Sequence, residues 1–352
     1  MVKQGITTAA PAIAPDGGAG PLDRLGRPMR DLRVSVTDRC NFRCPYCMPG
    51  EVFGRDFVFL RSDEVLRFEE ITRVVRVAAG LGVTKIRLTG GEPLLRRQIE
   101  KLVMMIAAVD GIETALTTNG SLLVGKARAL KEAGLGRVTV SLDSLDNTVF
   151  QAMNGVGFPV ERVLEGIAAA AEAGFGPIKV NVVVKRNIND RGVLDMARFG
   201  RENGHTVRFI EFMDVGATNG WRLDDVVPAA EILEAIDAVF PLEAVPADYP
   251  GEVARRYRYR DGGGEIGLIA SVSQPFCRTC TRARLTADGN LFTCLFATAG
   301  HDLRAVLRAT EDDAELSALL ARVWRARGDR YSEERSSLTS AGKRIEMSYV
   351  GG

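Results

Sequence analysis

Strand-like and helix-like segments alternate along the chain as far as residue 214, and this alternation limits the folds that the chain can adopt. Strand segments alternate apolar with polar residues, whereas helical segments repeat apolar residues every three or four positions. The strands are predicted at 31–36, 84–91, 113–120, 137–143, 177–184 and 206–214. The helices are predicted at 62–82, with a Ser or Asp cap at its start, and at 96–109, 121–134, 160–174 and 190–203. This order predicts a parallel sheet with right-handed crossovers.

The polarity of the strands refines that prediction. Several of them carry one polar residue among apolar ones, which does not suit an open sheet buried on both faces. A barrel with a polar interior accommodates such strands, because its inner face can meet water or a ligand. The fold class is therefore α/β, a partial (β/α)6 barrel of the TIM type.

The pattern changes near residue 225, where we place a domain boundary. A helix at 229–240 precedes two runs with Asp-Gly between strand-like segments, at 255–273 and 282–294, which predict β-hairpins. The sequence GGGEIG at 262–267 fits a nucleotide-binding glycine pattern, but no helix follows it, so we interpret it as a hairpin loop. A helical region at about 301–327 and a polar tail follow. The predicted units are a flexible tail (1–22), the barrel (23–225) and a C-terminal α+β region (226–352).

The composition excludes several classes of protein. In the 352 residues, 46 Lys and Arg balance 45 Asp and Glu, so the net charge of +1 gives no general attraction to nucleic acid or to an anionic membrane. No apolar run approaches the ~18 residues of a membrane span. The first twenty residues lack the basic start and apolar stretch of a signal peptide, so we expect a cytoplasmic protein.

Six cysteines form two groups of three. Their positions are Cys40, Cys44 and Cys47, and Cys277, Cys280 and Cys294. Disulfides are typical of small secreted domains, whereas clustered thiols in a reducing compartment usually bind metal. Three ligands in each group suggest two metal centres that each keep a position open, since structural zinc prefers four ligands and only two histidines are present. On spacing alone, a single site that combines the two groups stays open.

The first group resembles the radical S-adenosylmethionine (SAM) enzymes. It has their Cys-x₃-Cys-x₂-Cys spacing, with the aromatic Tyr46 before the last cysteine, and Gly90-Gly91-Glu92-Pro93 follows the next strand. The resemblance implies a [4Fe–4S] cluster whose free iron chelates SAM, while the GGE motif holds the SAM amino group. It also implies reductive cleavage of SAM to a 5′-deoxyadenosyl radical.

Longer segments are similar to the GTP 3′,8-cyclase family. These include RDLRVSVTDRCNFRCPYCMP, KIRLTGGEPLLRR, VSLDSLD, RFIEFMDVG, SVSQPFCRTCTRARLTADGNLFTCLFA and the final Gly-Gly, in the expected order from about residue 23 onwards. The resemblance implies conversion of GTP to (8S)-3′,8-cyclo-7,8-dihydroguanosine 5′-triphosphate, the first step of molybdenum cofactor biosynthesis. It further implies a second [4Fe–4S] cluster that binds guanine, an electron donor such as flavodoxin or ferredoxin, a following enzyme that forms cyclic pyranopterin monophosphate, and a homodimer.

Basic residues inside the predicted strands point to an anionic ligand without help from the resemblance. They are Arg33, Lys85, Arg87, Lys179 and Arg208, each in a largely apolar strand. Unpaired charges in a barrel interior are costly. A polyphosphate would neutralise them, and arginine binds phosphate oxygens through two hydrogen bonds.

The resemblance assigns these and other positions to ligands. For GTP it implies Arg33, Arg87, Thr117, Lys179, Arg282 and Arg284, the last two also catalytic, and we add Lys85 and Arg208. For SAM it implies Tyr46, Gly91, Ser141 and Met213. The resemblance also implies that the C-terminal Gly351 and Gly352 insert into the active site, and we expect the preceding RIEMSYV to be extended.

Two other functions stay open from the sequence. One is a radical SAM enzyme that modifies a peptide and carries an auxiliary cluster, and the other is a non-catalytic Fe–S or zinc scaffold. The basic strand residues favour GTP over a peptide.

Overall fold

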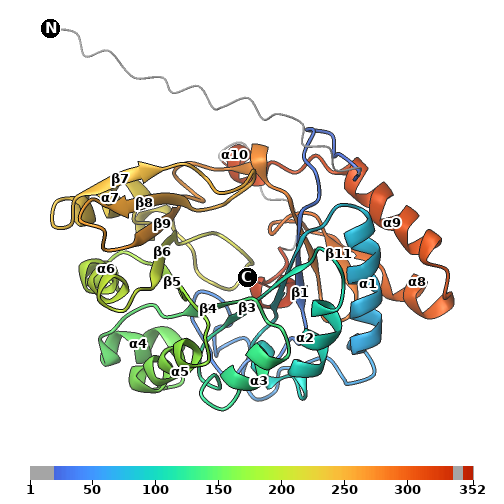
Figure 1. The fold of residues 1–352 in the computed structure, drawn as a ribbon, viewed down its shortest axis with the longest axis horizontal. Coiled ribbons are helices and arrows are strands. Elements are labelled where there is room, and N and C mark those ends of the chain that lie inside the picture. Colours follow the sequence, from blue (N-terminus) through green and yellow to red (C-terminus); the bar gives the residue numbers. More distant parts are fainter. Residues whose placement is uncertain (1–19, 336–343, 352) are drawn as a thin grey trace, which may run out of the picture.

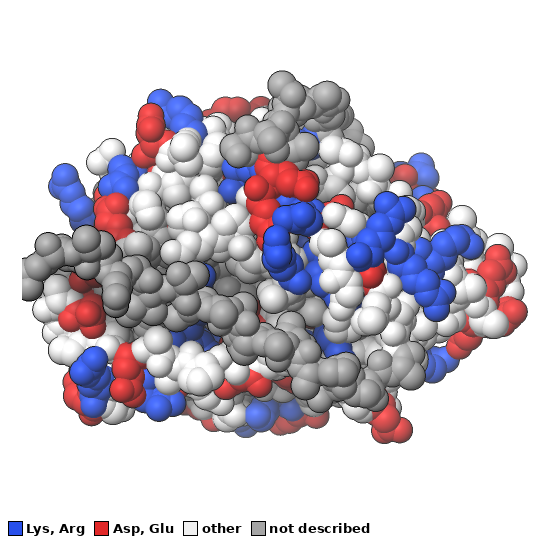
Figure 2. Space-filling model, turned by 90° about the horizontal axis from the view of Figure 1, so that it is seen from above, with Lys and Arg blue, Asp and Glu red and all other residues white. Residues whose placement is uncertain are grey.

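The computed structural model describes residues 20–335 and 344–351. Most of the tail predicted at 1–22 therefore lies outside the described residues. Within it, Leu22 forms an isolated β-bridge with Pro28. No helix among the described residues is long and apolar enough to cross a membrane. On the face seen in Figure 2, basic and acidic side chains are interspersed, in keeping with the balanced net charge.

The six predicted strands form one parallel sheet in sequence order, which confirms the central prediction. They are β1 (Asp31–Ser35), β2 (Lys85–Thr89), β3 (Glu113–Thr118), β4 (Arg137–Ser141), β5 (Lys179–Val184) and β6 (Thr206–Glu211). Figure 1 shows this sheet curved around a central space, with helices along its outer side. The sheet has two free edges in its strand order and does not close, as a partial barrel requires.

The predicted helices are present, with shorter bounds. They are α1 (Phe68–Gly80), α2 (Ile99–Ala107), α3 (Ala127–Glu132), α5 (Val160–Glu172), α6 (Val193–Glu202) and α7 (Ala229–Asp237). The predicted Ser or Asp cap of the first helix is wrong. Helix α1 begins at Phe68 because the Leu66 amide donates to the carbonyl of Ala287, and the Glu70 carboxylate accepts from the Arg67 amide at 2.6 Å.

One helix was missed, α4 (Asn147–Asn154). Its signals were present in the sequence: the Asp146 side chain accepts from the Val149 amide, and Gly155 ends the helix at φ +68°. Short 3-10 turns are also present: η1 (Pro93–Leu95), η2 (Asp190–Gly192), η3 (Leu223–Asp225) and η4 (Cys277–Thr279).

The hydrophobic core lies between the outer face of the sheet and the helices. Leu32 and Val34 of β1 are buried, as are Ile86 and Leu88 of β2. The alternate residues of these strands point to the inside of the curve, which is where the basic side chains lie. The strand alternation thus separates an apolar outer face from a polar inner face.

Both C-terminal hairpins are confirmed, and both extend the barrel sheet. The first consists of β8 (Arg255–Tyr259) and β9 (Glu265–Ile269), and the second of β10 (Arg282–Leu285) and β11 (Asn290–Phe292). Strand β9 pairs in parallel with β6, and β10 pairs in parallel with β1. Eight neighbouring strands are therefore parallel, and the sheet continues across the domain boundary predicted at 225. The boundary itself stays a prediction.

The remaining elements flank this sheet. Strands β7 (Leu242–Val245) and β12 (His301–Asp302) form its outer edges, and α8 (Arg304–Ala309), α9 (Asp313–Ala326), α10 (Tyr331–Glu334) and α11 (Met347–Val350) follow. The extended conformation predicted for RIEMSYV is wrong in its second half, because α11 is one helical turn that buries Ser348 and Val350. A short alternating run is compatible with either conformation, and packing decides between them.

Glu211, at the end of β6, joins the barrel to the C-terminal region. Its buried carboxylate accepts hydrogen bonds from the amides of Ala229 at 2.7 Å, Val272 at 2.7 Å and Ser273 at 2.8 Å. Ala229 is the first residue of α7, so the negative charge also lies at the positive end of a helix. One side chain therefore fixes the position of α7 and of the loop after β9.

We expect Glu211→Ala to destabilise the metal-free chain. Three buried amides would lose their acceptor, at about 1–3 kcal/mol each, which gives on the order of 3–9 kcal/mol in total. Urea unfolding of the metal-free protein measures this loss, with Glu243→Ala, on the exposed side of β7, as the control. A Glu211→Ala protein as stable as the control would contradict the role we give this carboxylate.

Candidate active site

A cavity of about 300 Å³ fills the inside of the curved sheet, and all six cysteines line it. Cys40, Cys44 and Cys47 follow the carboxyl end of β1. Cys280 instead precedes β10, which runs parallel to β1 with Asp31 opposite Arg282. The two cysteine groups thus lie at opposite ends of the same strands. Five-residue strands rise about 3.3 Å per residue, so roughly 15 Å of inner face separates the two groups.

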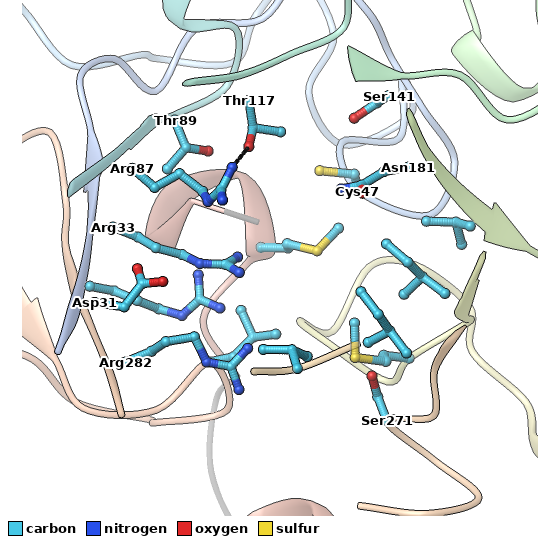
Figure 3. A pocket seen from close by; sticks show the side chains of 18 of the residues that line it. Asp31, Arg33, Cys47, Arg87, Thr89, Thr117, Ser141, Asn181, Ser271 and Arg282 are labelled. Carbon is cyan, nitrogen blue, oxygen red and sulfur yellow. Dashed lines mark hydrogen bonds between the residues drawn. The ribbon is translucent and has the colours of Figure 1, made fainter. Parts of the chain in front are cut away.

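Basic side chains occupy the inner face between the two groups. The strand register places Arg33 opposite both Arg87 and Arg284, and Lys85 opposite Asp31. Figure 3 shows Arg33, Arg87 and Arg282 extending into one space, across from Ser141, Asn181 and Ser271. We call Arg33, Lys85, Arg87, Lys179, Arg208, Arg282 and Arg284 the cationic ring.

The carboxylate of Asp31 favours the charged form of several members of the cationic ring, but it does not neutralise them all. In the part of the chain that the structure describes, none of its members forms an ion pair with a carboxylate, and the buried Nε atoms of Arg33 and Arg208 have no hydrogen-bond partner. Arg87 donates to the hydroxyls of Thr117 at 3.1 Å and Thr139 at 3.2 Å. Neutral hydroxyls orient a guanidinium without neutralising it.

Burial and mutual repulsion lower the pKa of most of these groups. Burial and Arg87 lower the pKa of Lys85 to about 8 and that of Arg208 to about 9. Burial and the charge of Arg282 lower the pKa of Arg284 to about 10. Burial and the charges of Arg284 and Arg282 lower the pKa of Arg33. Such an arrangement is unfavourable in the empty protein and favourable around an anion.

Lys179 differs from the other members. It does not line the cavity, although the register places it beside Thr139 on the inner face of the sheet. Burial and Arg208 lower its pKa to about 8, so it shares the same electrostatic environment. The other residues that the resemblance assigns to ligands, Tyr46, Gly91, Thr117, Ser141 and Met213, all line the cavity.

The first cysteine loop is held by contacts that the sequence analysis did not predict. Arg43 donates to the carbonyls of Cys40 at 2.8 Å and Phe53 at 2.7 Å. The Arg43 carbonyl rests against Gly155, where a Cβ atom would overlap it. Gly155 ends the unpredicted helix α4, so that helix supports the loop. Burial raises the pKa of Cys40 to about 11 and that of Cys47 to about 12, and metal binding would remove these protons.

Two buried carboxylates position the surroundings of this loop. The Glu92 carboxylate accepts hydrogen bonds from the amides of Leu94 at 2.9 Å and Asn119 at 2.7 Å and from the Thr118 hydroxyl at 2.8 Å. Burial raises the pKa of Glu92 to about 7. Asp143 accepts from the Tyr46 hydroxyl at 2.7 Å, and burial raises its pKa to about 6.

The Glu92 carboxylate is therefore hydrogen-bonded to groups of the protein itself. Gly91 packs against the carbonyl of Arg39, so closely that a Cβ atom would overlap it. The GGE segment and the cysteine loop are thus in direct contact, which explains why both motifs occur together.

In the second cysteine group Cys280 has a contrasting electrostatic environment, whereas burial raises the pKa of Cys294 to about 12. The β10–β11 hairpin returns Cys294 to the cavity that Cys277 and Cys280 line, as predicted. Although burial raises the pKa of Cys280, the guanidinium groups of Arg282 and Arg327 outweigh it and lower the pKa to about 6. Arg282 donates to the Cys280 Sγ at 3.4 Å. A thiolate stabilised in this way is a ready metal ligand.

The C-terminal segment enters the cavity wall. The carbonyl of Gly351 accepts a hydrogen bond from Arg284, and a Cβ atom on Gly351 would overlap Thr89. Gly352 lies outside the described residues. The Glu346 carboxylate accepts from the Ala217 amide at 3.0 Å and the Thr218 hydroxyl at 2.9 Å, in the loop that follows Met213. Gly351 is not among the residues that line the cavity, and the insertion of the tail into the active site stays a prediction.

The donor sets fit iron–sulfur clusters. Each group offers three cysteine thiols and the cavity offers no histidine, which is the chemistry of Fe–S ligation. No three His, Cys, Asp or Glu side chains of the described residues are grouped so as to hold a single metal ion. In the first group the Phe42 amide donates to the Cys40 Sγ at 3.4 Å, a contact common around bound thiolates.

Comparison with known proteins defines the class. The Radical SAM superfamily profile matches residues 34–200, and the Molybdenum Cofactor Synthesis C profile matches residues 205–333. The chain is a radical SAM enzyme of partial-barrel fold with a C-terminal Molybdenum Cofactor Synthesis C domain.

The relatives define the family. A GTP 3′,8-cyclase of Acidothermus cellulolyticus is 54% identical over 357 residues, covering 94% of this chain and 98% of that protein. One of Staphylococcus carnosus is 50% identical over 335 residues, with the same coverage of 94% and 98%. The chain therefore belongs to the GTP 3′,8-cyclase family.

Solved structures agree on the fold. Streptococcus suis SuiB bound to the precursor peptide SuiA has a TM-score of 0.63 at 16% identity, covering 89% of this chain and 68% of SuiB. The structure of anSMEcpe with bound AdoMet and the Cp18Cys peptide has a TM-score of 0.54 at 15% identity, covering 91% and 93%. At these identities the likeness concerns the fold alone, so the peptides in those structures say nothing of this chain's substrate.

Proposed function

We propose that this chain converts GTP to (8S)-3′,8-cyclo-7,8-dihydroguanosine 5′-triphosphate, the first step of molybdenum cofactor biosynthesis. The observation that carries the proposal is the cationic ring. Its members except Lys179 line one cavity together with both cysteine groups, and none of them forms an ion pair with a carboxylate among the described residues. A triphosphate brings the negative charge that this arrangement requires. The cyclase relatives support the same substrate.

Cys40, Cys44 and Cys47 would hold the first [4Fe–4S] cluster, with SAM beside Tyr46, Gly91, Ser141 and Met213. When bound, this pair supplies the 5′-deoxyadenosyl radical that abstracts hydrogen from ribose carbon 3′ of GTP. The protein's part is to orient the ligands and exclude water. The Tyr46–Asp143 hydrogen bond fixes the cysteine loop to the end of β4, and the Gly91–Arg39 contact fixes it to the end of β2.

Cys277, Cys280 and Cys294 would hold a second [4Fe–4S] cluster whose open iron binds guanine. Support comes from the three-cysteine donor set and from its position at the opposite end of the strands. Arg33, Arg87, Thr117, Lys179, Arg282 and Arg284 would bind the nucleotide, and Lys85 and Arg208 would extend the set. Arg282 and Arg284 are also the residues that we expect to stabilise charge during cyclisation.

The rival functions have less support. A peptide substrate gives no reason for so many unpaired basic side chains inside the barrel. A zinc scaffold would use closed sets of four ligands, whereas each group here has three cysteines. A flavodoxin or ferredoxin as electron donor, the coupling to the following enzyme, the homodimer and the cytoplasmic location stay predictions.

Anaerobic reconstitution with SAM, GTP and a reductant tests the proposal. Mass analysis should find the cyclised nucleotide and 5′-deoxyadenosine. Cys44→Ala should abolish SAM cleavage, whereas Cys280→Ala should mainly impair GTP binding and turnover. A chain that cleaves SAM but leaves GTP unchanged would overturn the substrate, and Cys44→Ala protein that forms 5′-deoxyadenosine at the wild-type rate would overturn the first cluster assignment.

Arg87→Ala and Lys179→Ala should weaken GTP binding more than SAM binding. Loss of a desolvated charge contact costs on the order of 2–5 kcal/mol, and each 1.4 kcal/mol is about tenfold in affinity. Equilibrium binding of each ligand measures the effect, with the exposed Arg128→Ala on α3 as the control. Equal losses for both ligands would show that the two residues are structural.

The affinity for GTP should also fall as the pH rises above about 8. The pKa values of Lys85 and Lys179 are lowered to about 8 in the free protein, so each ammonium is about half deprotonated at that pH and loses the rest of its charge above it. Because the triphosphate favours the charged form, binding at higher pH must take up protons. Calorimetry in two buffers of different ionisation enthalpy measures this uptake. The Lys85→Met/Lys179→Met protein should show less uptake, and equal uptake would contradict the assignment.

Removal of Gly351 and Gly352 should suppress cyclisation while both cysteine groups keep their iron. A second variant tests the attachment of the tail. In Gly216→Ala the new Cβ atom would overlap the Glu346 carboxylate, whereas Gly220→Ala, also at positive φ, meets nothing within 4 Å. Product formation should fall in Gly216→Ala and persist in Gly220→Ala. Unchanged product in the deletion variant would show that the tail is dispensable.

A further inference from the structure

Three buried charged residues form a hydrogen-bonded network beside the second cysteine group. They are Asp23, Arg27 and Arg327, at 7%, 3% and 4% relative exposure. Asp23 accepts from Arg27 Nε at 2.6 Å and from Arg327 Nη1 at 3.1 Å. Residues some 300 positions apart thus form one network, which we call the Asp23 network.

Each part of the second cysteine group is bonded to this network. Arg27 Nη1 donates to the carbonyl of Cys277 at 2.6 Å. Arg327 Nη1 donates to the carbonyl of Cys280 at 2.7 Å, and its Nε donates at 3.0 Å to the carbonyl of Thr293, which precedes Cys294. Two guanidinium groups therefore fix the backbone at all three cysteine positions.

One contact reaches a ligand atom directly. Arg327 Nη2 donates to the Sγ of Cys280 at 3.2 Å. In addition, the buried Nη2 of Arg27, a residue that lines the cavity, has no hydrogen-bond partner among the described residues. A buried donor without an acceptor is costly in the empty protein, and a sulfide of a bound cluster is an acceptor that could satisfy it.

We propose that the Asp23 network is the supporting shell of the second cluster, and that Arg327 is a positioning residue that holds the Cys280 thiolate and raises the reduction potential of that cluster. The inference rests on the proposed function only in that it requires a cluster at this group. Hydrogen bonds to cluster sulfur and nearby positive charge favour the reduced, more negative state. Asp23 has the separate task of keeping two like-charged guanidinium groups together.

The test uses a parent in which Cys40, Cys44 and Cys47 are all Ala, so that only the second group can bind iron. In this parent, Arg327→Met removes the charge and the donors, Arg327→Lys keeps the charge, and Asp23→Asn keeps the shape of the carboxylate. Arg325→Met, exposed in the last turn of α9, is the control. Iron per chain under a competing chelator and the midpoint potential of the reconstituted cluster are measured, with thermal unfolding of each metal-free chain.

We expect Arg327→Met to bind iron roughly 10- to 100-fold more weakly and to shift the potential downwards, with Arg327→Lys between it and the parent. Arg325→Met should match the parent. If Arg327→Met fails to fold, the iron binding and the midpoint potential of Arg327→Lys and Asp23→Asn decide the outcome. Full iron binding at an unchanged potential in the folded variants would overturn this inference alone. A parent that binds no iron would overturn the second cluster itself.

Discussion

The structure depends on a concentration of positive charge that the protein does not neutralise by itself. Seven basic side chains belong to the inner face of one curved sheet, and burial together with mutual repulsion lowers the pKa of most of them. A protein interior carries such charges only where a ligand compensates them. The unfavourable electrostatic free energy of the empty cavity is therefore the basis of its affinity for a polyanion.

The parallel pairing of β10 with β1 makes this cavity a two-ended site. It brings Arg282 and Arg284 into register with Asp31 and Arg33, although some 250 residues separate them. Because Cys280 precedes β10 whereas Cys40 follows β1, the same pairing places one cysteine group at each end of the strands. A nucleotide between them could reach both ends at once. The hairpins thus complete the site as well as the sheet.

Buried polar contacts support each end, in addition to apolar packing such as that of Phe42 against Phe150 and Phe158. Arg43 and Asp143 hold the first cysteine loop, and the Asp23 network holds the second. Glu211 and Glu346 perform a similar task for the segments that close the cavity. Each carboxylate or guanidinium satisfies several backbone groups, so a few side chains fix loops that have little regular structure of their own.

The sequence by itself determined the six parallel strands, the two cysteine groups and the basic positions on the strands. These follow from periodicity, spacing and alternation, which are local properties of the chain. The hairpins were also predictable, since Asp-Gly between strand-like runs is a local signal. The residues Asp23, Arg27 and Arg327 gave no such signal, because isolated charged residues far apart in sequence are usually exposed.

Only the tertiary structure decided how these parts meet. Sequence patterns do not specify which strand pairs with which edge, so the joining of β9 and β10 to the barrel could not be predicted from them. The turn of α11 and the contact of Gly351 with Arg284 likewise depend on residues distant in the chain. Long-range pairing is set by packing and charge compensation across the whole fold, and it is this pairing that turns two cysteine motifs and scattered arginines into one site.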